Sequence, residues 1–256
     1  RPNISRPISA WDTECSGWNK ERAPLMSEDS ICSPSVRWLH SRGRYRMGKL
    51  HECFENTITK IGFTHAELPG AFFNSAPIGI RFEIGGKENV YLPDDKGLNL
   101  IYVKNAFYRA KTLFDGLPCR PVLLRIDNYP EEADRITLQT LSQVGLPAPD
   151  ETIKEKRIDE GACFFQEHLY WDLAKNNCQI DKLLLEIIKG DIGGFSCLCS
   201  NVYFLNAKCA ILYHLYDDRG VDIVANDKYS LLPLYQKYNE WILQYDKAKI
   251  DQLFAN

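Results

Sequence analysis

The sequence predicts an α+β domain with a mixed, largely antiparallel sheet and helices packed on it. Three observations predict this class. Segments with helical and strand periodicity follow one another along the chain, one segment alternates apolar and polar residues, and two apolar runs flank a short polar loop near the C-terminus. The last observation predicts a C-terminal β-hairpin, and the apolar spacing after it predicts a long amphipathic helix.

Length and composition narrow the class of protein further. The chain has 256 residues, enough for one large domain or two small ones, and its net charge of −3 gives no overall basic field for nucleic acid or for an anionic membrane. No apolar run approaches the roughly 18 residues that a membrane span requires. We therefore expect a cytoplasmic protein that binds neither nucleic acid nor a membrane.

The nine cysteines are expected to be reduced thiols, most of them buried. Their number is odd, the chain is long, and its first residues lack the apolar core of a secretory signal. No set of cysteines and histidines has the spacing of a structural zinc site, so the sequence predicts no metal and no cofactor.

Residues 1–46 differ in composition from the rest of the chain. They hold eight basic and five acidic residues, whereas residues 47–256 hold 23 basic and 29 acidic residues and therefore carry a net charge of −6. We find no apolar period in the first segment, while helical periodicity begins at Met47. Residues 1–46 are thus expected to be an irregular basic extension outside the natural protein, and 47–256 a single α+β domain. The alternatives are a disordered arm and an arginine-rich arm that binds nucleic acid.

Helical and strand patterns follow one another from Met47 onward. Helices are expected at 47–62, 103–114, 130–144, 180–190 and 230–245, and strands at 78–85, 121–126, on both sides of a turn at 159–162, at 202–205 and at 209–216. In the strand at 78–85, Arg81 alternates with Ile80 and Phe82, so only one face of this strand is expected to be buried.

The loop YDDRG connects the two apolar runs near the C-terminus. A short polar segment that ends in glycine has the form of a hairpin loop. Gly220 is expected to supply a positive φ, and Asp217 and Asp218 are expected to accept hydrogen bonds from loop amides. Arg219 is expected to be exposed or to pair with a nearby carboxylate such as Asp222. A metal or general-acid site and a surface for a partner are the alternatives to a structural hairpin loop.

A candidate functional surface is nevertheless centred on this loop. Its residues are His214, Tyr216, Asp217, Asp218, Arg219 and Asp222. His214 lies within an apolar run, which favours a core histidine. The chain contains no G-x-S-x-G, H-E-x-x-H, Walker or G-x-G-x-x-G motif. The sequence therefore assigns no catalytic, cofactor-binding or metal-binding residue.

Four stretches of the chain resemble a known bacterial family. They are FFNSAPIGIRFEIGG (72–86), NAFYRAKTLF (105–114), YHLYDDRGVDIVA (213–225) and LLPLYQKYNEWILQYD (231–246). Together they are similar to the family called domain of unknown function 3885, and the most specific part is YDDRGVDI followed by PLYQKYNEWI. The resemblance covers roughly residues 47–254. It implies a compact α+β domain and carries no established activity, so no catalytic residue is transferred.

Two classes of function remain open. The first is a non-enzymatic protein-binding domain of immunity or regulatory type, for instance one that neutralises a basic toxin-like partner. The net charge of −6 and the tyrosine-rich C-terminus favour it. The second is a metal-dependent hydrolase or nuclease, in which carboxylates surround Mg²⁺. It requires that at least two of these residues converge: Glu83, Asp127, Asp217, Asp218 and Asp222.

Overall fold

The computed structural model describes residues 48–63, 72–93, 96–132, 135–159, 162–192, 198 and 200–255. The prediction about residues 1–46 lies outside this part of the chain. Residues from Arg46 onward belong to one unit of the fold, and the paragraphs below concern that unit.

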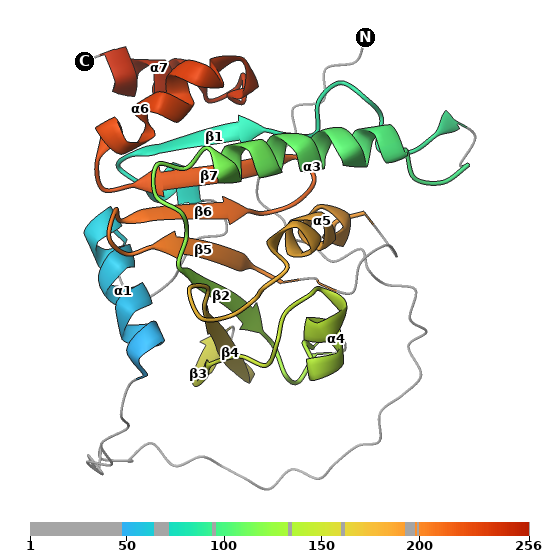
Figure 1. Ribbon diagram of the computed structural model, residues 1–256, viewed down its shortest axis with the longest axis vertical. Helices are drawn as coiled ribbons and strands as arrows, with labels where there is room; N and C mark the ends of the chain where they lie inside the picture. Colours follow the sequence, from blue (N-terminus) through green and yellow to red (C-terminus); the bar gives the residue numbers. More distant parts are fainter. Residues whose placement is uncertain are drawn as a thin grey trace, which may run out of the picture. The chain divides into compact units, whose positions relative to one another are not determined.

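A seven-stranded sheet lies at the centre of this unit (Figure 1). The strands are β1 Gly79–Glu83, β2 Leu123–Asn128, β3 Glu151–Asp159, β4 Ala162–Asp172, β5 Val202–Asn206, β6 Ile211–Leu215 and β7 Gly220–Ala225. Their order is β1-β7-β6-β5-β2-β4-β3, and every neighbouring pair is antiparallel. The predicted α+β class with a largely antiparallel sheet is confirmed, as are the hairpin β6–β7 and the helical segment after it.

Helices cover both faces of the sheet (Figure 1). They are α1 Lys49–Ile61, α2 Phe72–Ser75, α3 Leu100–Asp115, α4 Leu138–Gln143, α5 Ile180–Gly190, α6 Lys228–Lys237, the 3₁₀ helix η2 Asn239–Trp241, and α7 Lys247–Ala255. Side chains of α1 pack on one face, together with Phe72 of α2. Side chains of α3, α4 and α5 pack on the other. Each face of the sheet thus has its own hydrophobic core.

The C-terminal segment lies along the edge strand β1. The backbone N–H of Leu243 donates to the carbonyl of Arg81 at 3.0 Å, and Phe82 forms an isolated bridge with Ile242. These contacts cover an edge that would otherwise present unpaired backbone groups. Arg81 is only 8% exposed, because it pairs with Asp222 and lies against the rings of Phe73 and Tyr216. The expectation that this face of β1 meets solvent was therefore wrong at Arg81, whereas Glu83 is exposed as expected.

Three helix starts differ from the sequence prediction because side chains cap the backbone at other positions. The helix expected from 103 begins at Leu100, after Asn99, whose side chain accepts from the N–H of Ile101. The helix expected from Pro130 begins instead at Leu138, where Thr137 and Thr140 form a capping box. At the C-terminal helix, Asp227 rather than Ser230 accepts from the first backbone N–H groups. The amphipathic segment that follows is divided into α6, η2 and α7.

Two cysteines also differ from the prediction of free thiols. Cys119, which precedes β2, is joined by a disulfide to Cys209, in the turn between β5 and β6. Cys53, Cys163 and Cys178 are free thiols. Within the described residues, no helix is both long enough and apolar enough to cross a membrane.

Candidate functional site

The carboxylates of the β6–β7 loop accept hydrogen bonds from the loop itself and from helix α3. Asp217 accepts from the backbone N–H of Arg219 at 2.7 Å and from its guanidinium Nε at 2.7 Å. Asp218 accepts from the hydroxyl of Tyr102. Both aspartates are buried, at 3% and 4% exposed. The predicted hydrogen bond from a loop amide is confirmed for Asp217, whereas Asp218 accepts from Tyr102 of α3 instead. Arg219 pairs with Asp217 and Asp191 rather than with Asp222.

Gly220 is required for a reason other than the one predicted. It does not adopt a positive φ; instead it begins β7 and pairs with Glu83. A Cβ atom at this position would lie 1.9 Å from the hydroxyl oxygen of Tyr216 and 2.5 Å from its Cζ. The close approach of the Tyr216 ring, rather than backbone conformation, excludes a larger side chain.

Gly220→Ala is therefore expected to lower the free energy of unfolding by about 1–3 kcal/mol, as overpacking of a buried site does. Urea denaturation measures the change. Adding the same substitution to Tyr216→Ala should cost much less, because the ring that the new methyl group would meet is gone. Additive losses from the two substitutions would contradict this explanation.

The strand residues of the candidate surface point into the protein. Asp222 is 0% exposed and forms a two-point ion pair with Arg81, with Nε–Oδ1 at 2.7 Å and Nη2–Oδ2 at 2.9 Å. His214 is 1% exposed, and its Nδ1 lies 3.0 Å from the carbonyl oxygen of Val202. Burial lowers the pKa of His214. Tyr216 is partly buried, so Arg219 is the one exposed residue of the six.

The carboxylates proposed for a metal site are not gathered in one place. Asp217 and Asp218 lie together with Asp191, and one oxygen of each lies within 4.8 Å of the others. Arg219 already contacts this group, since its Nη2 is 3.3 Å from Asp191. Asp222 is paired with Arg81, Asp127 is paired with Arg125, and Glu83 is exposed at the end of β1. Burial raises the pKa of Asp191 and of Asp218.

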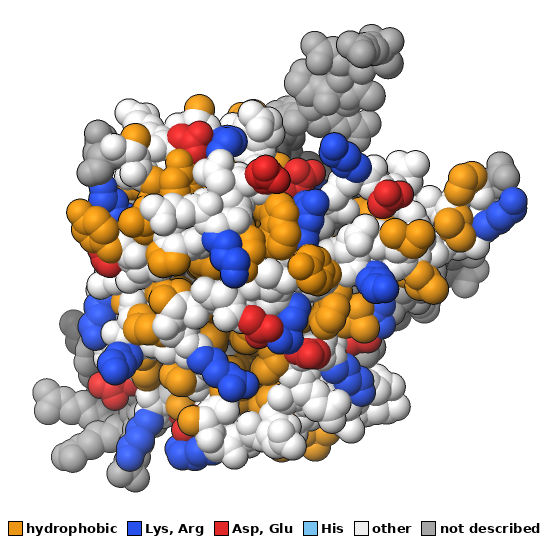
Figure 2. Space-filling model, turned by 45° about the horizontal axis from the view of Figure 1, so that its top comes forward, with side chains coloured by type: hydrophobic (Ala, Val, Ile, Leu, Met, Phe, Trp, Pro, Cys, Tyr) orange, Lys and Arg blue, Asp and Glu red, His pale blue; other side chains and the backbone are white. Residues whose placement is uncertain are grey.

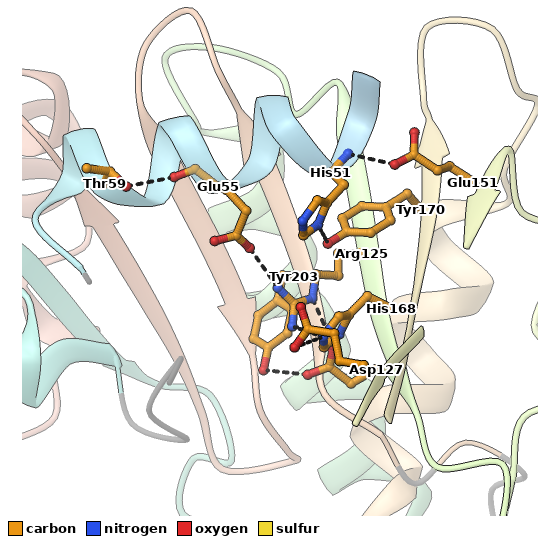
Figure 3. Close-up of polar contacts among 10 residues, drawn as sticks. His51, Glu55, Thr59, Arg125, Asp127, Glu151, His168, Tyr170 and Tyr203 are labelled. Atoms are coloured by element: carbon orange, nitrogen blue, oxygen red, sulfur yellow. Dashed lines mark hydrogen bonds and ion pairs between the residues drawn. The ribbon is translucent and has the colours of Figure 1, made fainter. Parts of the chain in front are cut away.

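A second buried polar cluster lies between α1 and the sheet (Figure 3). Arg125 and Asp127 occupy alternate positions of β2, and register places Asp127 opposite His168 of β4. Asp127 Oδ1 lies 2.8 Å from Arg125 Nε and 2.7 Å from His168 Nδ1. The guanidinium carbon of Arg125 lies 4.8 Å from the ring centre of Phe54 and 5.5 Å from that of Tyr203. All three charged or titratable groups at the centre are at most 4% exposed.

Further polar side chains extend this cluster toward solvent (Figure 3). Glu55 of α1 lies 3.5 Å from Arg125 Nη1, and Glu155 of β3 lies 3.5 Å from His168 Nε2. Glu151 accepts from the backbone N–H groups of Leu50 and His51 at 3.0 and 3.1 Å, so it caps the start of α1. The cluster therefore holds α1 on the sheet through ion pairs and a cap.

An aspartate that orients a histidine is also the arrangement of a general base. Here His168 is 1% exposed and faces carboxylates from both ring nitrogens, which favours a structural role. One feature of the sequence could have predicted this cluster. Arg125 and Asp127 are two charges at alternate positions of an otherwise apolar strand, and buried charges in a strand require partners on its neighbours.

Exposed apolar side chains gather on α3 and on the turn that precedes it. They are Tyr91, Leu92, Leu100, Ile101 and Tyr108, with exposed fractions of 48%, 41%, 73%, 63% and 62%. We call these five residues the α3 surface. Figure 1 shows this turn extending from the N-terminal end of α3, and Figure 2 shows hydrophobic and basic side chains side by side on this projecting part of the protein.

A comparison with known protein families finds a match over most of the chain. A family model described as a domain of unknown function, DUF3885, matches residues 56–246. The chain belongs to this family. The DUF3885 match includes the α3 surface, the β6–β7 hairpin and α6, which agrees with the stretches that carried the resemblance in the sequence. The family's description assigns no activity.

One curated relative shares part of this sequence. It is the uncharacterized protein YnaE of Bacillus subtilis (strain 168), which is 39% identical over 57 residues. The match covers 22% of this chain and 27% of that protein, so it spans much less than two thirds of the relative. No solved structure matches the chain.

Proposed function

We propose that this DUF3885 chain is a protein-binding domain of immunity or regulatory type and that the α3 surface is its contact. One observation carries the proposal. Of the ten large apolar side chains that are most exposed among the described residues, five fall between Tyr91 and Tyr108. Scattered apolar side chains are normal on a protein surface, whereas a local group of this kind is typical of an interaction site.

The α3 surface is held in place by its own backbone and by caps. Asn99 accepts from the backbone N–H of Ile101 at 3.0 Å, and its Nδ2 donates to the carbonyl of Asn89 at 2.9 Å. Tyr91 pairs with Leu98 in a bridge. A surface that is already ordered loses less conformational entropy on binding, so these contacts support a role in recognition.

Aromatic side chains continue from the α3 surface onto η2. The ring centre of Tyr108 lies 6.3 Å from that of Trp241, which stacks on Tyr238 at 4.9 Å. Tyrosine and tryptophan are enriched among the residues that dominate binding energy in protein interfaces. The tyrosine-rich C-terminal region, which suggested a protein partner in the sequence, thus borders the α3 surface.

The double substitution Leu100→Ser with Ile101→Ser is expected to weaken partner binding at least about tenfold, as the loss of apolar anchors does. The fold should stay intact, because both side chains are exposed. Affinity capture from cells of the source organism, followed by titration of the identified partner, measures the effect. Leu138→Ser is the matched control, since Leu138 is 69% exposed on α4. Equal binding by the double variant and wild type would contradict the proposal.

A metal-dependent hydrolase is the second candidate, and the convergence of Asp191, Asp217 and Asp218 favours it. The position of Arg219 disfavours a metal ion at this place, because its guanidinium already balances two of these carboxylates. We therefore expect Mg²⁺ or Mn²⁺ to leave the melting temperature of the protein unchanged. A metal ion that binds only the native state would raise the melting temperature. A metal-dependent rise that is lost in Asp217→Ala would make the hydrolase the leading candidate.

A further inference from the structure

We infer that the α3 surface recognises a partner protein whose contact surface is acidic, and not a second copy of this chain. The inference rests on the proposed function and concerns the chemistry of the partner. It follows from the charge of α3, from the position of Lys104 and from the symmetry that a dimer would impose.

The helix that carries this surface is locally basic. Helix α3, Leu100–Asp115, has three basic residues, Lys104, Arg109 and Lys111, and one acidic residue, Asp115, which pairs with Lys111. This local excess contrasts with the net charge of −6 over residues 47–256. A partner that lies against α3 therefore meets positive charge, whatever the sign of the whole domain.

Lys104 is an exposed cation on α3. It lies three residues after Ile101 and four before Tyr108, so the three side chains share one helix face. Lys104 is exposed and forms no ion pair within the described part of the chain. By contrast, Lys111 pairs with Asp115 and Asp181. A partner that covers Lys104 removes water from its ammonium, and a carboxylate on the partner compensates that buried charge best.

Arg109 adds a second positive group beside the aromatic side chains. Its guanidinium carbon lies 5.3 Å from the ring centre of Trp241, and its Nη1 donates to the carbonyl of Glu83 at 3.2 Å. These contacts fix the guanidinium without neutralising its charge, because a ring and a carbonyl carry no net charge. Two cations thus flank Tyr108 along the helix.

Local charge outweighs net charge at contact distance. At physiological ionic strength, exposed charges are screened over about 8 Å, so groups on the far side of the domain act weakly at the α3 surface. The domain's net charge of −6 predicts a basic toxin-like partner from long-range attraction. The residues on α3 predict acidic groups where the two proteins touch, and contact residues determine specificity.

A symmetric dimer through this surface is disfavoured. A two-fold interface brings the same patch of both copies together, so Lys104 and Arg109 of one copy would lie against the same cations of the other. Nucleic acid is also disfavoured, because its affinity depends on several phosphate contacts. The α3 surface offers mainly leucine, isoleucine and tyrosine side chains around Lys104.

The test places the photo-reactive residue benzoylphenylalanine at Tyr108 of the full chain, expressed in the source organism. After irradiation, mass spectrometry identifies the cross-linked molecule and the peptide in contact. We expect a protein whose cross-linked segment is rich in aspartate and glutamate. The same residue placed at Tyr245, which is 87% exposed, controls for non-specific capture.

Charge exchange then tests the contact itself. Lys104→Glu should weaken binding of the identified partner about tenfold, and a carboxylate-to-lysine substitution in the partner's cross-linked segment should restore it. Lys60→Glu on α1, an exposed lysine on the other face of the sheet, is the matched control and should change little.

The outcomes separate this inference from the proposed function. A partner protein with a neutral or basic contact, or no loss with Lys104→Glu, overturns the acidic-partner inference and leaves protein binding standing. A cross-link to a second copy of the chain also overturns the inference. Cross-links to nucleic acid alone, or to no macromolecule, overturn both.

Discussion

Replacing Asp127 with alanine is expected to lower the free energy of unfolding by about 3–5 kcal/mol, because it leaves a buried guanidinium without its partner. Arg125 is 4% exposed, and its nearest other carboxylate, that of Glu55, is 3.5 Å away and more exposed. His168 loses its Nδ1 partner in the same substitution. Urea denaturation followed by circular dichroism measures the loss.

Two further variants test the cause of this loss. Asp115→Ala removes an exposed partner of Lys111, and such surface pairs contribute about 0–1 kcal/mol. The double variant Arg125→Met with Asp127→Leu should lose less than Asp127→Ala alone, because no unpaired charge stays buried. If Asp127→Ala costs less than about 1 kcal/mol, the cluster does not hold α1 on the sheet.

The same pair predicts a pH dependence. Burial alone would raise the pKa of Asp127, but Arg125 and His168 hold it below the ordinary value of 3.8. A group whose pKa is depressed in the folded state contributes stability above its unfolded pKa and loses it as the pH falls. Wild type should therefore lose stability below pH 3.8, and Asp127→Ala should lose less over the same range.

Local patterns in the sequence predicted most of the elements. The apolar stripes of α1, α3 and α5 and the two strands around the turn at 159–162 follow from the spacing of residues close in the chain. The start of α4 was missed because a favourable local signal at Pro130 competed with the Thr137 capping box. Glu151, which caps α1, lies 101 residues from Leu50, and no local pattern reveals such a contact.

The candidate site was predicted less well, because its residues meet through contacts between distant parts of the chain. The apolar run around His214 correctly predicted its burial, but the burial of Asp222 depends on Arg81, 141 residues away. Likewise, Asp127 and His168 meet through strand register across 41 residues. The α3 surface did leave a local signal. Leu100 and Ile101 lie off the buried stripe that contains Val103, and their exposure becomes evident once the helix is known to begin at Leu100.

The second large effect concerns the ion pair between β1 and β7. Arg81 lies against the rings of Phe73 and Tyr216, with its guanidinium carbon 5.2 and 5.7 Å from their centres. Asp222 binds it at two points and also accepts from the backbone N–H of Phe73 at 3.0 Å. Asp246 is 3.7 Å from Arg81, too far for a hydrogen bond. Asp222 therefore provides the close contacts to this buried charge.

Asp222→Ala is expected to destabilise the protein by about 3–5 kcal/mol, since Arg81 stays buried and the N–H of Phe73 loses its acceptor. Hydrogen exchange should show reduced protection of the Phe73 amide, while the amides of α5, on the other face of the sheet, change less. The sign of the stability change distinguishes a structural ion pair at Asp222 from a metal site. In a metal site, removing a carboxylate relieves repulsion and stabilises the metal-free protein. A more stable Asp222→Ala variant would therefore show that Asp222 serves a ligand rather than Arg81.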